Sequence, residues 1–265
     1  MSSIEEKRVY ADRSGETTLF LASELGVVRV SVSGDSIGSF GIEHRCRARD
    51  LAWIDGLVVA TDEDVLIGGE PTGFGPAVAV CGSKEPIAVS PEGQIARYDG
   101  GWSEIGQADE VRGADGDLLA TPEGVYRVGD DLQHVGLAGA NDVSTPGTPL
   151  AATDSGLYRL GNGWMRDLDG AFERVATDRE SPPGELGRAC ALDEHGGLFV
   201  YDGEWRERET PEPFAALAVG EAVYGATAEG TLRVDAGDGW RSGALGVSGV
   251  CAMLVGGSPR DRKRV

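Results

Sequence analysis

Short apolar runs alternate with glycine-containing turns along the whole of this 265-residue chain. The clearest example is the stretch Leu150–Trp164, which reads LAATDSGLYRLGNGW. Two apolar runs flank a turn at Asp154–Gly156, and a second turn delivers Trp164 to the start of a third run. Short runs bounded by turn residues are typical of β-strands. The stretch therefore predicts consecutive short antiparallel strands.

The same pattern occurs seven times along the chain. A turn glycine or aspartate marks each copy, and the markers are Gly26, Asp64, Gly93, Gly124, Gly156, Gly197 and Gly230. Successive markers lie 29 to 41 residues apart. A strand-rich unit repeated at this spacing indicates the blades of a propeller. Asp64 departs from the glycine pattern, and we expect it to keep the turn because aspartate tolerates the left-handed backbone.

These repeats predict an all-β fold, a single seven-bladed β-propeller built from short four-stranded blades. In the fifth copy the strands are expected at residues 141–145, 150–153, 157–160 and 164–168. The other inner strands are expected at Asp50–Ile54, Ala77–Cys81, Glu110–Arg112, Arg174–Thr177 and Phe214–Val219. We assign residues 1–257 to the propeller and expect the basic tail, residues 258–265, to be disordered.

Two segments of the chain could each supply the strand that closes the ring. Arg8–Ala11 and Gly249–Leu254 could each supply the inner strand of the first blade. An open ring would expose free sheet edges, and pairing the C-terminal run with N-terminal strands covers them. We therefore expect Gly249–Leu254 to close the ring. An eight-bladed ring is disfavoured because the sequence contains no eighth pair of second and third strands.

The repeat has a common motif, which is two apolar residues followed by Ala-Thr-x-x-Gly, one apolar residue and Tyr-Arg. This motif resembles the repeats of two-component-regulator sensor propellers and of BNR-type propellers. Three segments resemble degenerate Asp-box turns, and these are Tyr98–Trp102, Tyr201–Trp205 and Asp235–Trp240. Nearly the whole chain resembles a stand-alone β-propeller family of haloarchaea. The resemblance implies the fold and no particular chemistry. No equivalent of the arginine triad or the Tyr–Glu pair of sialidases is found.

The charge balance is strongly acidic. There are 44 acidic and 24 basic residues, and the formal net charge is −20. Only three of the basic residues are lysine, at Lys7, Lys84 and Lys263. Acidic, lysine-poor chains resemble proteins of halophilic archaea, in which molar salt shortens the screening length to about 3 Å. Binding to bulk nucleic acid is excluded because it needs a basic face.

Nothing in the sequence indicates a membrane or a secreted protein. No run approaches the ~18 apolar residues of a membrane span. The segment Met1–Arg8 is polar and lacks the apolar core of a signal peptide. The four cysteines, Cys46, Cys81, Cys190 and Cys251, form no C-x-x-C motif, and three of them lie in apolar runs. We expect a cytoplasmic monomer with reduced thiols.

Charged residues lead several predicted inner strands, and these are Asp50, Glu110, Asp142 and Arg174. Strand alternation would direct such side chains toward the propeller axis. Clustered oxygen ligands suit a hard divalent cation such as Ca²⁺. These residues are our candidate ligand or metal site at the mouth of the propeller. The site supports an alternative function, a divalent-metal-dependent hydrolase or lactonase, and no other cofactor is implied.

A second candidate cluster consists of Arg45, Arg47 and Arg49. Their alternation would place three guanidinium groups on one side of an extended strand, where they could bind an anion. Pairing with nearby acids is the other interpretation. Those acids lie in the turns between second and third strands, and they are Glu24, Asp62, Glu63, Asp64, Glu92, Glu123, Asp154, Asp193, Glu194 and Glu229.

Four tryptophans begin predicted outer strands at equivalent positions, and they are Trp102, Trp164, Trp205 and Trp240. We expect each to pack against the neighbouring blade; an aromatic binding surface is the alternative. The sequence contains no nucleophile–base set, Gly-rich phosphate loop, G-x-S-x-G or H-E-x-x-H motif. We therefore predict a non-catalytic binding scaffold that presents one face to a protein or a small ligand.

The net charge predicts that stability depends on salt. Repulsion within a surface of charge −20 opposes the folded state until counter-ions screen it. Thermal melts at rising KCl concentration should show a rising melting temperature. A melting temperature that stays constant from dilute buffer to molar salt would contradict this prediction.

Overall fold

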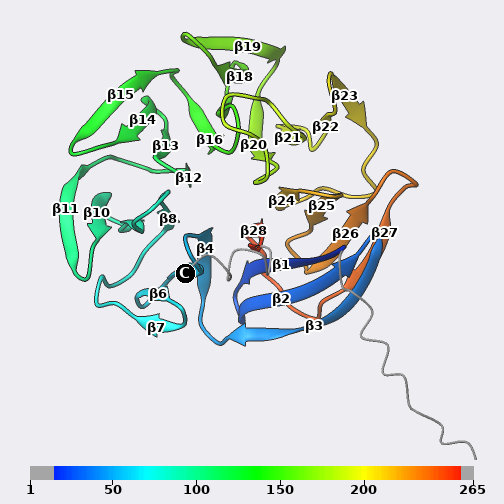
Figure 1. The fold of residues 1–265 in the computed structure, drawn as a ribbon, viewed down its shortest axis with the longest axis horizontal. Helices are drawn as coiled ribbons and strands as arrows, with labels where there is room; N and C mark the ends of the chain where they lie inside the picture. The colour runs from blue at the N-terminus through cyan, green and yellow to red at the C-terminus, as the bar shows by residue number, and fades with distance from the viewer. Residues whose placement is uncertain (1–14, 258–265) are drawn as a thin grey trace, which may run out of the picture.

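A computed structural model describes residues 15–257 of the chain. Their strands form seven four-stranded sheets, and no helix occurs within this range. The sheets lie as blades around a common axis in chain order (Figure 1). The predicted all-β, seven-bladed propeller is confirmed. Within the same residues there is no helix long and apolar enough to cross a membrane.

Each blade runs from an inner strand beside the axis to an outer strand at the rim. In this order, blade 1 is β28 (Ala252–Val255), β1 (Glu16–Ser23), β2 (Gly26–Ser33) and β3 (Ser36–His44); blade 2 is β4 (Ala48–Trp53), β5 (Leu57–Thr61), β6 (Val65–Ile67) and β7 (Glu70–Pro71); and blade 3 is β8 (Ala79–Cys81), β9 (Ile87–Val89), β10 (Gln94–Tyr98) and β11 (Trp102–Gln107).

The other four blades follow the same order. Blade 4 is β12 (Gly113–Asp115), β13 (Leu118–Thr121), β14 (Gly124–Val128) and β15 (Leu132–Gly136); blade 5 is β16 (Ala140–Ser144), β17 (Leu150–Thr153), β18 (Gly156–Leu160) and β19 (Trp164–Asp169); blade 6 is β20 (Phe172–Thr177), β21 (Ala189–Asp193), β22 (Leu198–Tyr201) and β23 (Trp205–Arg208); and blade 7 is β24 (Ala216–Val219), β25 (Val223–Ala226), β26 (Thr231–Asp235) and β27 (Arg241–Ala244).

The antiparallel order gives the propeller two distinct faces. The turns between second and third strands share one face with the loops that lead into the inner strands, and we call this the top face. The turns between inner and second strands share the bottom face with the turns between third and outer strands. The carboxylate-bearing turns predicted from the repeats therefore all lie on the top face.

The two ends of the described chain meet in blade 1. β28 is antiparallel to β1, with Leu19 opposite Val255 and Ala22 opposite Ala252. The backbone N–H of Gly256 also donates to the carbonyl of Thr18 at 2.8 Å. Closure by the C-terminal run beside N-terminal strands is therefore confirmed. The rival strand, Arg8–Ala11, and the tail 258–265 lie outside the described residues.

Each blade buries apolar side chains on both of its faces. In β1, Leu19 and Leu21 belong to a core shared with blade 7, whereas Phe20 and Ala22 belong to a core shared with blade 2. Alternate side chains of a strand point to opposite faces, so a strand between two neighbours must be apolar at successive positions. This explains why the second strands read as continuous apolar runs.

The four tryptophans pack between blades, as predicted. Each indole N–H donates to the preceding blade: Trp102 to Thr72 Oγ1 at 3.1 Å, Trp164 to the Val135 carbonyl at 2.9 Å, Trp205 to Asp167 Oδ2 at 3.1 Å and Trp240 to the Glu209 carbonyl at 2.9 Å. A buried indole needs such an acceptor. The shared geometry explains why tryptophan returns at this position.

The inner strand of blade 4 differs from its prediction. It was expected at Glu110–Arg112 but occupies β12, three residues later. Glu110 has a φ of 48°, which is the left-handed region and is incompatible with an extended strand. The segment before Gly113 is therefore a loop on the top face.

Asp64 keeps its turn, but for a different reason than expected. The Thr61 N–H donates to the Asp64 carbonyl at 3.1 Å, and Asp64 is not among the described residues with a positive φ. Its carboxylate instead accepts backbone N–H groups, from Val65, Gly73, Phe74 and Gly75. Burial raises the pKa of Asp64, but these four hydrogen bonds outweigh it and hold the pKa below its ordinary value.

Removal of β28 should unfold the whole propeller, because it exposes the inner edge of β1 and an apolar face of each flanking blade. A chain ending at Ser248 should show a single, strongly lowered melting transition. A chain ending at Gly257, which retains β28, is the reference. Equal melting temperatures for the two chains would show that closure does not stabilise the fold.

Candidate functional site at the propeller axis

One register position is equivalent in the inner strands of all seven blades. Its residue pairs with the second-strand residue that lies one position before the Ser, Thr or Asp at the top-face turn. From blade 1 to blade 7 the position is occupied by Ala252, Asp50, Ala79, Gly113, Asp142, Arg174 and Ala216. We call it the axial position. Four blades carry a small residue there, and blades 2, 5 and 6 carry a charged one.

The three charged residues share a local distortion of the backbone. The pairing register shifts between Ala48 and Asp50, between Ala140 and Asp142, and between Phe172 and Arg174. A bulge of this kind inserts one residue and redirects the side chain that follows it. In these three blades the inner strand also pairs with the last residue of the second strand, beyond the bulge.

Asp50 and Asp142 connect neighbouring inner strands. Asp50 Oδ1 accepts the N–H of Leu51 at 2.8 Å, and Oδ2 accepts the N–H of Val80 in blade 3 at 3.0 Å. Asp142 does the same with Val143 at 2.9 Å and with Val175 in blade 6 at 3.0 Å. Each carboxylate thus satisfies a backbone donor that has no partner in its own sheet.

Burial perturbs both carboxyl groups. It raises the pKa of Asp50 to about 7 and that of Asp142 to about 6, although the hydrogen-bonded N–H groups and the Arg174 guanidinium oppose the rise. The negative charge of Asp142 also raises the pKa of Asp50. Both groups therefore change protonation near neutral pH.

Arg174 is the uncommitted member of the set. Its charge lowers the pKa of both Asp50 and Asp142, which places it near the two carboxyls. It is half-buried, yet it forms no hydrogen bond or ion pair with another residue of the described range 15–257. Its donors remain available to water or to a ligand.

Below the axial position, Asp115 repeats the contact between blades. Its Oδ2 accepts the backbone N–H of Thr145 at 2.6 Å and the Thr145 hydroxyl at 2.9 Å. Burial raises the pKa of Asp115, and the hydrogen bonds and the charge of Arg179 partly offset this. Arg179 reaches from blade 6 to the Val255 carbonyl at 3.3 Å and lies over the Trp53 ring. It thus crosses the bottom end of the axis.

Glu110 does not belong to this site. It pairs with Arg112 at 3.0 Å in the top-face loop, and its side chain is 65% exposed. Gly113 takes the axial position of blade 4 instead. A Cβ at Gly113 would lie 2.5 Å from Asp142 Oδ1, so only glycine leaves room for the Asp142 carboxyl. The predicted set is therefore reduced to Asp50, Asp142 and Arg174.

The arginine cluster on the top face is largely paired. Arg47 lies 3.1 Å from Glu24 and 3.5 Å from Asp62, and an Arg49 nitrogen donates to Asp62 at 2.8 Å. These contacts agree with the interpretation that the arginines pair with turn acids. Arg45 is exposed and forms no ion pair within residues 15–257, so anion binding there remains a prediction.

Two of the top-face acids accept hydrogen bonds from polar groups of their own blades. Asp193 Oδ1 accepts the N–H groups of His195 at 2.9 Å and Gly197 at 2.7 Å, and Asp154 accepts the side-chain amide of Asn141 at 2.8 Å. In the described part of the chain, no three His, Cys, Asp or Glu side chains are grouped so that they could hold a metal ion. The acidic ring is thus not a preformed metal centre in residues 15–257.

The fold and the axial site define a seven-bladed β-propeller without a recognisable catalytic constellation among the described residues. More specifically, the chain belongs to the HVO_0234-like β-propeller family, whose model matches residues 3–256. No curated protein matches the sequence.

Similar solved structures share the fold at low sequence identity. A chain of a nidogen/laminin complex is 10% identical with a TM-score of 0.58, and the match covers 90% of this chain and 98% of that chain. The computationally designed Ika8 protein is 17% identical with a TM-score of 0.55, covering 90% and 91%. YCF48 from Cyanidioschyzon merolae is 13% identical with a TM-score of 0.54, covering 78% and 88%. These likenesses extend to the fold alone.

The raised pKa of Asp50 predicts a pH-dependent stability. A folded-state pKa above the unfolded value means that the contribution of Asp50 is fully favourable below about pH 4 and is lost as pH rises to about 7. The Asp50→Asn variant has no titrating carboxyl group at this position, so its stability does not fall in this way. The unfolding free energy of the parent minus that of the variant should therefore fall by about 4 kcal/mol between about pH 4 and about pH 8.

Urea melts across this pH range measure the difference. Asp55→Asn, at an exposed turn of the same blade, is the matched control and should follow the parent at every pH. If Asp50→Asn also follows the parent in its pH profile, Asp50 does not titrate in this range in the folded protein.

Proposed function

We propose that this protein is a non-catalytic binding scaffold that takes a ligand group at the top end of its axis. Arg174 would donate hydrogen bonds to the ligand, and Asp50 and Asp142 would accept them. The observation that carries the proposal is the uncommitted guanidinium of Arg174, half-buried beside two carboxyls. Withdrawing N–H donors from water without hydrogen-bond acceptors is costly, and a ligand that accepts from Arg174 would remove that cost.

The mixture of charges favours an amphoteric ligand. Each oxygen of Asp50 and Asp142 accepts one backbone N–H and retains a second lone pair. A ligand with a carboxylate for Arg174 and an ammonium or amide N–H for the carboxyls would use the whole set. Free amino acids and peptide ends have this chemistry, so the bound group can belong to a small molecule or to a protein.

A metal-dependent hydrolase is supported less well. Such a site needs several oxygen or nitrogen ligands that converge on one ion. At the axial position, the two carboxylates are already engaged by backbone N–H groups of neighbouring blades. The experiment below therefore includes dependence on a divalent cation as an alternative outcome.

Calorimetry can test the amphoteric site with simple probes. Glycylglycine carries both groups, whereas acetate and methylamine carry one each. The parent should bind glycylglycine more tightly than either, and Arg174→Gln should weaken this binding by about tenfold, as expected for one charge-assisted hydrogen bond. Arg206→Gln, which removes the same charge at the rim, is the matched control and should bind like the parent.

Two results would overturn the proposal. One is equal binding of glycylglycine by the parent and by Arg174→Gln. The other is Ca²⁺-dependent hydrolysis of a lactone or ester that is lost in Asp142→Asn while the melting temperature is retained. The second result would establish the metal-dependent alternative.

A further inference from the structure

A pocket on the bottom face lies where the loop between β20 and β21 folds over blade 5. Its volume is about 430 Å³, and it is lined by Thr148, Pro149, Arg159, Leu160, Gly161, Met165, Gly184 and Leu186. Gly184 and Leu186 come from the Pro/Gly-rich segment 179–187, which breaks the repeat pattern. The Gly184 N–H donates to the Gly147 carbonyl at 3.0 Å and holds that segment in place. The volume falls in the range of small-molecule sites.

The propeller repeat supplies an internal comparison for Arg159. Arg97, Arg127 and Arg159 occupy one register position, each opposite the first residue of the second strand in blades 3, 4 and 5. In blade 3 the arginine pairs with Glu85 at 3.5 Å, and in blade 4 it pairs with Asp117 at 3.0 Å. Both acids lie in the turn just before the second strand.

Blade 5 has no acid in that turn. Thr148 and Pro149 stand there instead, and Arg159 pairs with Asp167 of β19 at 3.2 Å. The Asp167 side chain is only 8% exposed, and it also accepts the indole N–H of Trp205. Asp167 therefore pairs with the Arg159 guanidinium without lining the pocket, and no carboxylate lies on the side of Arg159 that faces the pocket.

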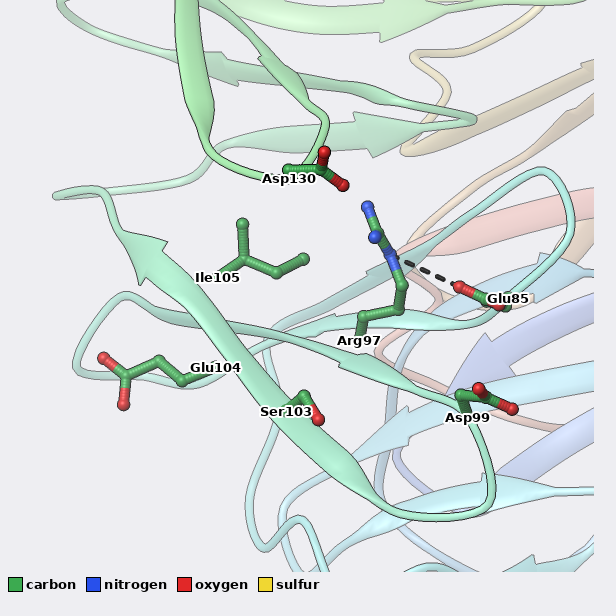
Figure 2. A pocket seen from close by; sticks show the side chains of 7 residues that line it. All are labelled: Glu85, Arg97, Asp99, Ser103, Glu104, Ile105 and Asp130. Atoms are coloured by element: carbon green, nitrogen blue, oxygen red, sulfur yellow. Dashed lines mark ion pairs between the residues drawn. The ribbon is translucent and has the colours of Figure 1, made fainter.

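The equivalent pocket of blade 3 has the opposite character. It surrounds Arg97 and is lined by four carboxylates, Glu85, Asp99, Glu104 and Asp130. Figure 2 shows the Arg97 guanidinium between Glu85 and Asp130. The pocket around Arg159 has no acidic lining residue, although the chain carries 44 acidic residues. Its other side chains include the apolar Pro149, Leu160, Met165 and Leu186.

We propose that the pocket between blade 5 and the segment 179–187 binds a small organic carboxylate with a branched or linear apolar body. The carboxylate pairs with the Arg159 guanidinium, which has five N–H donors and a single ion-pair partner in the described chain. The apolar body lies against Leu160, Met165 and Leu186. This site is on the face opposite the axial position and does not depend on the proposed function.

Calorimetry with 4-methylpentanoate as the probe can test the site. The parent should bind this acid more tightly than acetate, which lacks the apolar body, and more tightly than 4-methylpentanamide, which lacks the charge. Met165→Glu places a carboxylate in the pocket and should weaken binding by about tenfold or more. Met165 is 50% exposed, so the fold should tolerate this change.

The repeat also provides the matched control. Ser103 stands opposite Arg97 as Met165 stands opposite Arg159, so Ser103→Glu makes the same change in blade 3 and should leave binding unchanged. Arg159→Gln should abolish binding if its melting temperature shows that the fold is retained. Arg174→Gln should bind the probe like the parent, which separates this site from the axial one.

The proposal is overturned if the parent binds no 4-methylpentanoate at millimolar concentrations. It is also overturned if the amide binds as tightly as the acid, or if Met165→Glu binds as tightly as Ser103→Glu.

Discussion

The pairing of β1 with β28 is the constraint on which the rest of the structure depends. Each blade is apolar on both faces, so it is stable only between two neighbours. In an open row of blades, the first and the last would each expose an apolar face and a strand edge. Because blade 1 is built from both ends of the described chain, the ring closes and these apolar faces and strand edges are covered. A closed ring also fixes the inner strands around one axis, so that residues distant in sequence, such as Asp50 and Arg174, come near each other.

Backbone hydrogen bonding between blades explains much of the carboxylate placement. Neighbouring inner strands belong to different sheets, so some of their N–H groups have no strand partner. Asp50, Asp115 and Asp142 accept such donors from the next blade, and Asp64 does so for the loop that follows its own blade. The acidic composition therefore has a structural component beyond surface charge. A carboxylate so used is buried at the cost of a raised pKa, as at Asp50 and Asp142.

The repeat pattern predicted the strands, the closure and the tryptophan contacts because these depend on local alternation and on equivalent surroundings in each blade. Glu110 was misplaced because three residues separate the loop from the strand, and apolar spacing alone does not reveal a left-handed residue. The bulges before Asp50, Asp142 and Arg174 were also missed, since a bulge depends on the partner strand and leaves no composition signal. The lack of an acid before β17 was visible in the sequence, but it acquires meaning only when the register aligns Arg159 with Arg97 and Arg127.

Seven copies of one unit in a single chain make departures from the pattern informative. Replacement of an axial alanine or glycine by a charged residue adds desolvation cost, and the contacts with the next blade account for the two aspartates but not for Arg174. Loss of the turn acid beside Arg159 removes a favourable ion pair that blades 3 and 4 retain. In both cases a guanidinium keeps N–H donors that have no acceptor among the described residues. Arg174 lies near the carboxyls of Asp50 and Asp142, and Arg159 pairs with Asp167, so the chain itself balances part of each charge and the proposed ligands would take up only the remaining N–H donors.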